Sequence, residues 1–292
     1  MRWSSDESDI GMNYDASLED LCFPELIPPR FQAGKTYDRA MIGAEAARLS
    51  YFRFEEDAQS RQIIESALRI VGFEHVEYFA GSKEKGHAMA AVHVSGNEGL
   101  IAFRGTRPTK FKDIEIDLEL LLAPWPEGGN VHEGFARQFE ELREPLREWH
   151  ERIGRRPLLL AGHSLGAGLA TLCATVLKPS TLVTLGSSRV GDEQFVALLA
   201  GTEVHRFVNC CDVITRLPRI LTYTHVGKAR YIDRNGVELV DPTQDAIDRD
   251  CNRARWGYIV RYAWRPGNVL LRDAADHAPI NYVSAILRER QN

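Results

Sequence analysis

The segment from Leu158 to Leu177 constrains the fold more than any other part of the chain. It begins with an apolar run of strand length, Leu158 to Ala161, and continues from Ser164 with an apolar pattern of helix length. The residues between them, Gly162-His163-Ser164-Leu165-Gly166, leave room only for a tight turn. A buried strand that runs directly into a buried helix is typical of an α/β sheet covered by helices. The segment is about as long as a membrane span, but the turn divides it, so no span is predicted.

The remaining pattern supports the same class. Beyond position 130, strand-like and helical runs alternate, which predicts a mostly parallel central sheet with helices on both faces. Residues 1–34 show no clear period and contain several prolines, so we expect an extended or partly ordered leader, followed by a single domain over 35–292. Strands are predicted at 73–79, 88–94, 99–103, 157–161, 181–185 and 203–208, with a hairpin in 229–240, and helices at 37–54, 59–71, 133–153, 164–177, 191–199 and 278–288. The stretch 241–255 is charged and undecided.

Charge and cysteine content exclude several classes of function. The formal net charge is -5, with basic and acidic residues mixed along the chain, which argues against a nucleic-acid partner. The 5 cysteines include no C-x-x-C pair, so neither a disulfide framework nor a zinc site is predicted, and the adjacent Cys210 and Cys211 are expected to be buried as small hydrophobes. The N-terminus lacks the basic start and apolar stretch of a secretory signal. A cytoplasmic location is therefore expected, with export by a signal-independent route as the alternative.

The G-x-S-x-G sequence around Ser164 is typical of a nucleophile elbow, because it lies between a strand and a helix. Such a turn holds the serine Oγ at the carboxyl edge of the sheet, where the helix N-terminus favours developing negative charge. The backbone N–H of Leu165 would be one donor to that charge. Thr106 follows a predicted strand and could supply the second donor. These features predict acyl transfer through Ser164.

A serine nucleophile needs a base and an acid, and in this kind of fold they follow it in the order acid, then histidine. Asp212 is the best acid, because it comes directly after the strand 203–208 and its short extension. Asp192 begins a helix and is interpreted as an N-terminal cap. His225 and His277 both remain candidates for the base, and a loop near the C-terminus favours His277.

Several motifs in order resemble those of a known family, the class 3 lipases, which are the fungal-type triacylglycerol lipases and their bacterial relatives. The resemblance covers roughly residues 90 to 282. It rests on Phe103-Arg104-Gly105-Thr106, Val131-His132-Glu133-Gly134-Phe135, the elbow, Leu185-Gly186-Ser187-Ser188-Arg189-Val190-Gly191, Asp212-Val213-Ile214-Thr215-Arg216-Leu217-Pro218, His225-Val226-Gly227 and Asp276-His277.

This resemblance implies an α/β-hydrolase fold and a triad of Ser164, Asp212 and His277, with His225 outside it. It also implies an oxyanion hole from Thr106 and Leu165, acylglycerols or other lipid esters as substrates, and no metal or organic cofactor. The chain departs from the family pattern at Asp113-Ile114, where an Asp-Trp pair is usual, and at Ser188 and Thr215, where proline is usual.

The segment of about 107–130 corresponds to the lid of the family. Its apolar residues fall at i, i+4, i+7 and i+11, which predicts a helical stripe that could open at a lipid surface. The alternative is a helix or strand packed permanently on the core, because part of the segment also alternates with period two. The predicted stripe consists of Ile114, Leu118, Leu121 and Trp125.

Two further functions compete with lipid ester hydrolysis. A non-lipolytic carboxylesterase or a phospholipase would use the same residues, since a fold does not determine a substrate. A non-catalytic lipid-binding protein on the same scaffold is a further alternative. The sequence does not determine acyl chain length or oligomeric state.

Overall fold

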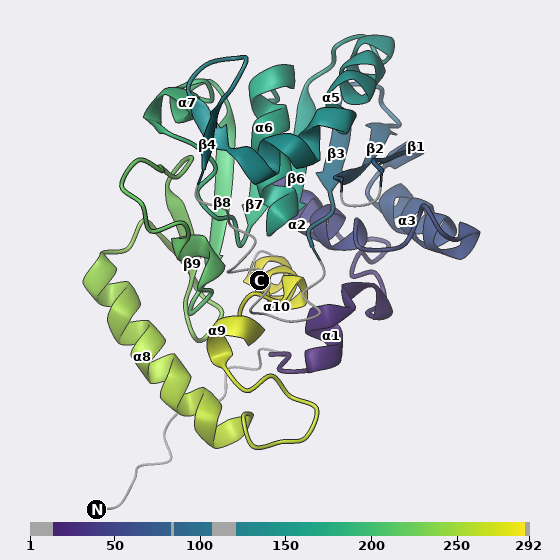
Figure 1. Ribbon diagram of the computed structural model, residues 1–292. Helices are drawn as coiled ribbons and strands as arrows, with labels where there is room; N and C mark the ends of the chain where they lie inside the picture. The colour runs from purple at the N-terminus through teal and green to yellow at the C-terminus, as the bar shows by residue number, and fades with distance from the viewer. Residues whose placement is uncertain (1–13, 83–84, 107–120, 290–292) are drawn as a thin grey trace, which may run out of the picture.

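The computed structural model describes residues 14–82, 85–106 and 121–289 (Figure 1). At its centre is an 8-stranded sheet in the order β1-β2-β3-β6-β7-β8-β9-β10. Neighbouring strands from β3 to β9 run parallel. Strand β2 is antiparallel to both of its neighbours, β1 and β3, and β10 is antiparallel to β9. The prediction of a mostly parallel sheet is thus confirmed.

The strands and helices largely follow the predicted order. The strands are β1 (Phe73–Ala80), β2 (His87–His93), β3 (Gly99–Phe103), β4 (Leu122–Pro124), β5 (Asn130–His132), β6 (Leu158–His163), β7 (Thr181–Leu185), β8 (Glu203–Asn209), β9 (Ala229–Ile232) and β10 (Glu238–Val240). The helices are α1 (Leu18–Cys22), α2 (Arg39–Leu49), α3 (Ala58–Ile70), α5 (Glu133–Arg152), α6 (Leu165–Leu177), α7 (Glu193–Ala197), α8 (Gln244–Arg261), α9 (Arg272–Ala275) and α10 (Pro279–Glu289).

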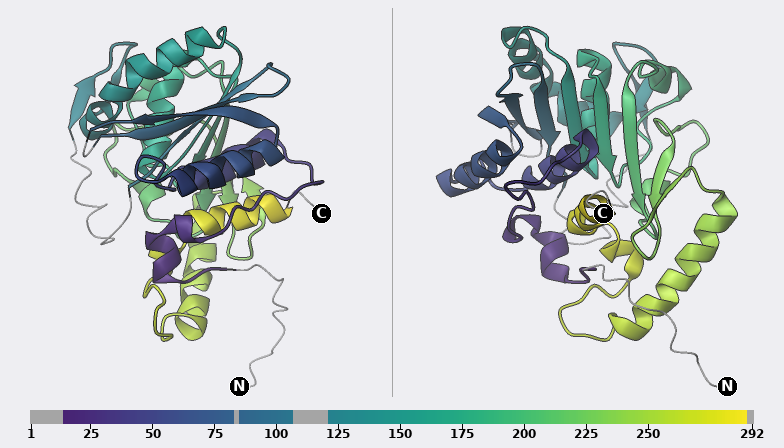
Figure 2. Two further views of the ribbon diagram at one scale, coloured as in Figure 1. Left: turned by 90° about the vertical axis from the view of Figure 1, so that its right-hand side faces the viewer. Right: turned by 180° about the vertical axis from the view of Figure 1, so that it is seen from behind.

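Helices cover both faces of the sheet, as Figure 2 shows from the side. One core lies between the sheet and α2, α3 and α10, and a second lies between the sheet and α5 and α6. Strand β6 contributes to both cores, because Leu159 and Ala161 face the first while Leu158 and Leu160 face the second. A strand buried on both faces has to be apolar throughout, which explains the continuous run in the sequence.

Some elements differ from the sequence prediction. The undecided stretch after residue 240 forms most of the long helix α8, of which only Cys251, Ala254 and Tyr258 are buried. A single buried stripe with charged and apolar residues outside it gives a weak helical period, so local pattern did not identify this helix. The short hairpin of β4 and β5 was not predicted either.

That hairpin corrects part of the predicted lid. Ile114 and Leu118 lie outside the described residues, and Leu121 is exposed. Trp125 is buried, and its indole N–H donates to Thr175 Oγ1 over 2.8 Å. The prediction of one helical stripe reaching Trp125 is therefore wrong, because β4 interrupts the helix period and the indole is part of the core beneath the hairpin.

The described part of the predicted leader packs against the domain. Arg48 is completely buried in α2, where it pairs with Glu45 over 2.6 Å. Its guanidinium also donates to the carbonyl oxygens of Pro24, Ile27 and Pro28. These bonds satisfy backbone groups of a segment that has little regular structure of its own. Within the described residues, no helix has both the length and the apolar character that crossing a bilayer requires.

Candidate active site

Ser164 lies at the sharp turn between β6 and α6. Its backbone has φ 57° and ψ -124°, which is strained for a residue with a side chain. The turn is held because the Ser164 N–H donates to Leu185 O of β7 over 3.0 Å. The hydroxyl thus stands at the carboxyl edge of the parallel strands, directly before the N-terminus of α6.

The glycines of the elbow are required by close backbone contacts. A Cβ on Gly162 would lie 2.1 Å from Gly166 O, and a Cβ on Gly166 would lie 2.2 Å from Phe103 O. The end of β3 is therefore pressed against the elbow. Phe103 of β3 is paired with Gly162 of β6. Thr106 comes three residues after Phe103, and Leu165 comes three residues after Gly162. Both predicted oxyanion donors therefore follow the carboxyl ends of neighbouring parallel strands, and Thr106 is exposed to solvent.

Three predicted residues from separate elements meet at this edge. His277 Nε2 lies 2.9 Å from Ser164 Oγ, and His277 Nδ1 lies 2.8 Å from Asp212 Oδ2. Asp212 follows β8, and His277 stands between α9 and α10. With the Nδ1 proton donated to the carboxylate, Nε2 is left to accept the serine proton. All three side chains are buried.

A tyrosine that the sequence analysis did not identify completes the carboxylate's surroundings. Tyr282 of α10 donates its hydroxyl proton to Asp212 Oδ2 over 2.6 Å, and the Ile214 N–H donates to Oδ1 over 2.9 Å. Burial raises the pKa of Tyr282 well above its usual value, so the phenol stays a donor. Tyr282 lies in an apolar helix, and nothing in the local pattern distinguishes it from a core residue.

His163 links the elbow to the loop that carries the base. Its Nε2 lies 2.7 Å from His277 O, and its Nδ1 lies 2.8 Å from the hydroxyl of Tyr51. Because a carbonyl oxygen can only accept, Nε2 carries the proton and Nδ1 accepts from the tyrosine. Burial, together with the neighbouring His277, lowers the pKa of His163 well below its usual value. His163 is therefore a neutral support for the base, which the sequence analysis had not assigned.

Asp276 joins the segment of the base to the segment of the acid. Its Oδ2 accepts the backbone N–H of Cys211 over 2.9 Å, and its Oδ1 accepts the hydroxyl of Tyr14 over 2.7 Å. Arg272 Nε lies 3.1 Å from the same carboxylate. Since Asp276 precedes His277 and Cys211 precedes Asp212, this buried carboxylate ties the two catalytic candidates together through their neighbours.

The other candidates lie elsewhere. His225 is surrounded by Arg206 and Arg189, and burial together with these charges lowers the pKa of His225 to about 3. Asp192 caps α7 by accepting the Phe195 N–H over 2.9 Å, which confirms its predicted role. The structure thus brings His277, and not His225, to Ser164.

Sequence comparisons identify related proteins. Residues 100–222 match the sequence profile of the family described as Lipase (class 3). The chain is similar to a lipase from Rhizomucor miehei, with 28% identity over 187 residues that cover 58% of this chain and 51% of that protein. It is also similar to the chloroplastic phospholipase A(1) DAD1 of Arabidopsis thaliana, with 37% identity over 113 residues that cover 32% of this chain and 25% of that protein. The chain thus spans about half the length of these relatives or less.

The fold has known counterparts as well. The solved structure of Rhizomucor miehei triacylglyceride lipase superposes with a TM-score of 0.57 at 22% identity, over 82% of this chain and 90% of that one. At this identity the likeness concerns the fold, which is that of the α/β-hydrolases.

Proposed function

We propose that this chain, of which residues 100–222 match the family Lipase (class 3), is a serine hydrolase that cleaves carboxylic esters of lipids through an acyl-enzyme on Ser164. The observation that carries this proposal is the continuous hydrogen-bonded chain from Ser164 Oγ through His277 to Asp212. A serine hydroxyl is a weak nucleophile until an adjacent base removes its proton, and this chain supplies that base.

In the first half of the reaction, Ser164 Oγ attacks the ester carbonyl while His277 Nε2 takes the hydroxyl proton. Asp212 stabilises the resulting imidazolium, and Tyr282 keeps the carboxylate in place. The backbone N–H of Leu165 and a donor of Thr106 stabilise the oxyanion. Collapse of the tetrahedral intermediate breaks the bond to the alcohol, which leaves with the proton from His277.

In the second half, water attacks the acyl group on Ser164. His277 takes a proton from the water and returns it to the serine oxygen as the carboxylic acid departs. The net reaction is ester plus water to acid plus alcohol, and every proton is exchanged through one imidazole. No further group is needed for this balance.

Hydrolysis of p-nitrophenyl esters from acetate to palmitate tests the proposal, with Ser164→Ala as the control. Turnover that is lost in the variant supports the serine mechanism, and the optimum in chain length separates lipid esters from short soluble esters. Absence of turnover on every ester, dispersed or soluble, would contradict the proposal and favour a lipid-binding protein.

A phospholipid is the second candidate substrate, and the similarity to a plant phospholipase A(1) favours it. Both substrates contain the same ester bond, so the proposed chemistry does not distinguish them. Mixed micelles that contain either a triacylglycerol or a phosphatidylcholine separate the two, because the ratio of kcat/KM measures the discrimination.

We further propose that the enzyme binds lipid surfaces through the outer face of α8 and the turn that follows it. Trp256 in α8 and Trp264 in the turn after it are 72% and 69% exposed, and the exposed Val260 lies four residues after Trp256 in the helix. Arg249 and Arg253 precede them at similar spacing. Tryptophan and arginine on one face of a helix suit the boundary of an anionic lipid layer. Helix α8 packs against α9, which leads to His277 (Figure 1).

Sedimentation with vesicles of phosphatidylcholine, with and without phosphatidylglycerol, tests this surface. The double variant Trp256→Ser/Trp264→Ser should bind about tenfold more weakly, since each substitution removes a large apolar area from the contact, and should hydrolyse short soluble esters normally. Val94→Ser is the control, because Val94 is also exposed but follows β2, which lies next to the edge strand β1 and far along the sheet from β9 and β10. Equal binding of the double variant and the control would overturn the assignment.

A further inference from the structure

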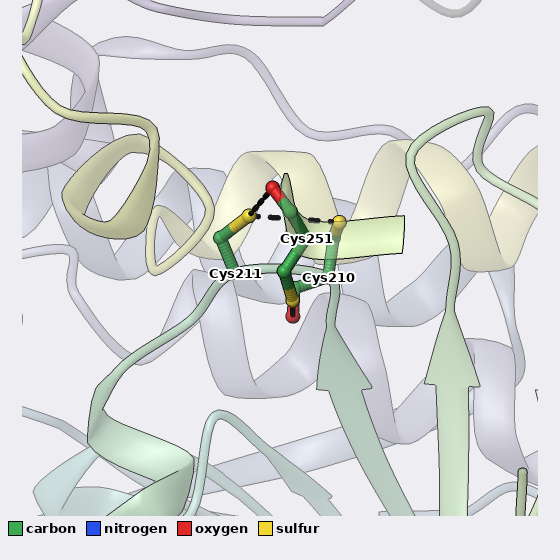
Figure 3. Close-up of side chains that lie close together, drawn as sticks. All are labelled: Cys210, Cys211 and Cys251. Carbon is green, nitrogen blue, oxygen red and sulfur yellow. Dashed lines mark hydrogen bonds between the residues drawn. The ribbon is translucent and has the colours of Figure 1, made fainter. Parts of the chain in front are cut away.

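Three cysteines that are not part of the proposed catalytic site converge behind it. Cys210 and Cys211 follow β8, and Cys251 comes from α8 (Figure 3). Their sulfur atoms all lie within 4.8 Å of one another, and all three residues are buried. The sequence predicted only burial, because the third thiol is too distant along the chain for a recognisable spacing.

The separation of the first two thiols suits binding of one ion. Cys210 Sγ and Cys211 Sγ are 3.7 Å apart. Two thiolates bound to one tetrahedral zinc ion, with bonds of about 2.3 Å, lie about 3.8 Å apart. Adjacent residues at the end of a strand therefore already hold two sulfur atoms at the distance that shared coordination requires.

A carboxylate lies next to one of the three thiols. Asp250 precedes Cys251 in α8, and its Oδ2 lies 3.3 Å from Cys210 Sγ. The hydroxyl of Tyr231 donates to the same oxygen over 2.9 Å, which orients the carboxylate. The three sulfur atoms thus supply three of the four ligands that zinc takes in closed structural sites, and Asp250, whose carboxylate is near Cys210 but not part of the 4.8 Å cluster, would have to move in as the fourth.

The surrounding charges suit a divalent ion. Arg216 Nη2 lies 3.4 Å from Cys251 Sγ, and Arg234 Nη1 lies 3.0 Å from Asp250 Oδ1. Three thiolates and one carboxylate carry four negative charges, which a divalent ion and two guanidinium groups would balance. Charge compensation of this kind is what permits thiolates in a buried position.

We propose that Cys210, Cys211, Cys251 and Asp250 form a binding site for a thiophilic divalent metal ion of the zinc type. The ion fastens α8 to the end of β8, directly before Asp212. Its role is structural, because the thiols lie outside the hydrogen-bonded chain of Ser164, His277 and Asp212. The proposal rests on the geometry of these four side chains and not on the proposed ester hydrolysis.

Titration of the chain of residues 1–292 with Cd²⁺ tests the site. The protein is first treated with a chelator and kept reduced with a phosphine, which competes for the metal less than a dithiol does. The expected result is an ultraviolet cadmium–thiolate charge-transfer band that saturates at one ion per chain. Zn²⁺ should displace the cadmium and raise the Tm, since a ligand that binds only the folded state stabilises it.

Variants distinguish this cluster from other thiols. Cys251→Ala should weaken Cd²⁺ binding by about 100-fold or more and abolish the rise in Tm, because it removes the only ligand sulfur from α8. Asp250→Asn should keep the charge-transfer band with weaker binding. The matched control is Cys173→Ala, which removes a buried cysteine of α6 and should bind Cd²⁺ as the wild type does.

Circular dichroism verifies that each variant is folded before the titration. A folded wild type that binds no stoichiometric Cd²⁺ or Zn²⁺ would overturn the proposal. So would a folded Cys251→Ala variant with unchanged affinity. Ester hydrolysis is measured separately, so the result on the metal is independent of the result on the proposed reaction.

Discussion

The two halves of the candidate site are built in different ways. The nucleophile half consists of the elbow around Ser164 and the end of β3, and backbone contacts that leave no room for a Cβ hold it together. The acid–base half consists of Asp212, His277 and Tyr282, which side-chain hydrogen bonds bring together from distant positions. The first half therefore depends on backbone shape and the second on polar partners. The two halves should therefore respond differently to substitution.

The largest expected effect tests whether the halves act as one unit. Ser164→Ala and His277→Ala should each lower kcat by about 10⁴-fold or more, and the double variant should lose no more than either alone. The reason is that His277 acts by removing the Ser164 hydroxyl proton, so its loss has no further effect once that hydroxyl is absent. Turnover of p-nitrophenyl butyrate by all three variants measures this coupling.

His225→Ala is the control for that experiment, because it removes a histidine that also follows Ser164 but lies beside Arg206. It should leave kcat within about threefold of the wild type. A loss as large as that of His277→Ala would contradict the assignment of the base.

The next effect concerns the backbone of the nucleophile half. Gly166→Ala should lower kcat by about 100-fold or more, as loss of an oxyanion donor does, because the new Cβ would lie 2.2 Å from Phe103 O and force β3 away from the elbow. It should also cost about 1–3 kcal/mol of unfolding free energy through overpacking. Urea unfolding together with steady-state kinetics measures both.

Gly154→Ala is the matched control for stability. Gly154 has a positive φ, but a Cβ added to it would meet no atom of the described residues within 4 Å, apart from its own chain neighbours. The variant should therefore be destabilised by backbone strain alone, with kcat unchanged. Normal activity in Gly166→Ala would remove the distinction between the two halves.

A smaller effect is expected for the polar partner of the acid. Tyr282→Phe removes the hydroxyl that donates to Asp212 Oδ2 but keeps the ring in the core. A hydrogen bond to a charged group contributes about 1.5–3 kcal/mol, and the lower end of that range corresponds to a fall in kcat of about tenfold. The loss should appear in kcat with little change in KM, which a purely structural defect would not reproduce.

The smallest effect concerns pH and stability. The pKa of His225 is lowered to about 3 in the folded protein by burial, with Arg206 and Arg189 adding to it, whereas an unfolded histidine titrates near 6.5. As the pH falls below that value, the unfolded chain binds a proton that the folded histidine does not. The free energy of unfolding should therefore fall by up to about 1.4 kcal/mol per pH unit for this group.

His163 should also lower the free energy of unfolding as the pH falls, because its pKa is likewise lowered by burial. His225→Gln should remove one of these two contributions and make stability less dependent on pH between about 7 and 5. Urea unfolding at both pH values measures the change. An unchanged slope would show that His225 is not buried as a neutral group.

Much of the secondary structure and the nucleophile elbow could be predicted from short segments of the sequence. The run Leu158 to Leu177 predicted a strand, a turn and a helix, since each is determined by residues adjacent in the chain. The strands β3 and β7 coincide with the predicted ranges because burial on both faces leaves an uninterrupted apolar run. The elbow and its order with Asp212 and the two histidines followed from the same local signals.

Tertiary structure decided the rest. The sequence left His225 and His277 as alternatives on the residues alone, and it assigned no part to Tyr282, because contacts between elements leave no local pattern. Trp125 was assigned to a lid although it belongs to the core, since an apolar side chain does not reveal which neighbour will cover it. Cys251 meets Cys210 only because α8 folds back along the end of β8. Periodicity reports which face of an element is buried, whereas the partner on that face is determined by the packing of the whole chain.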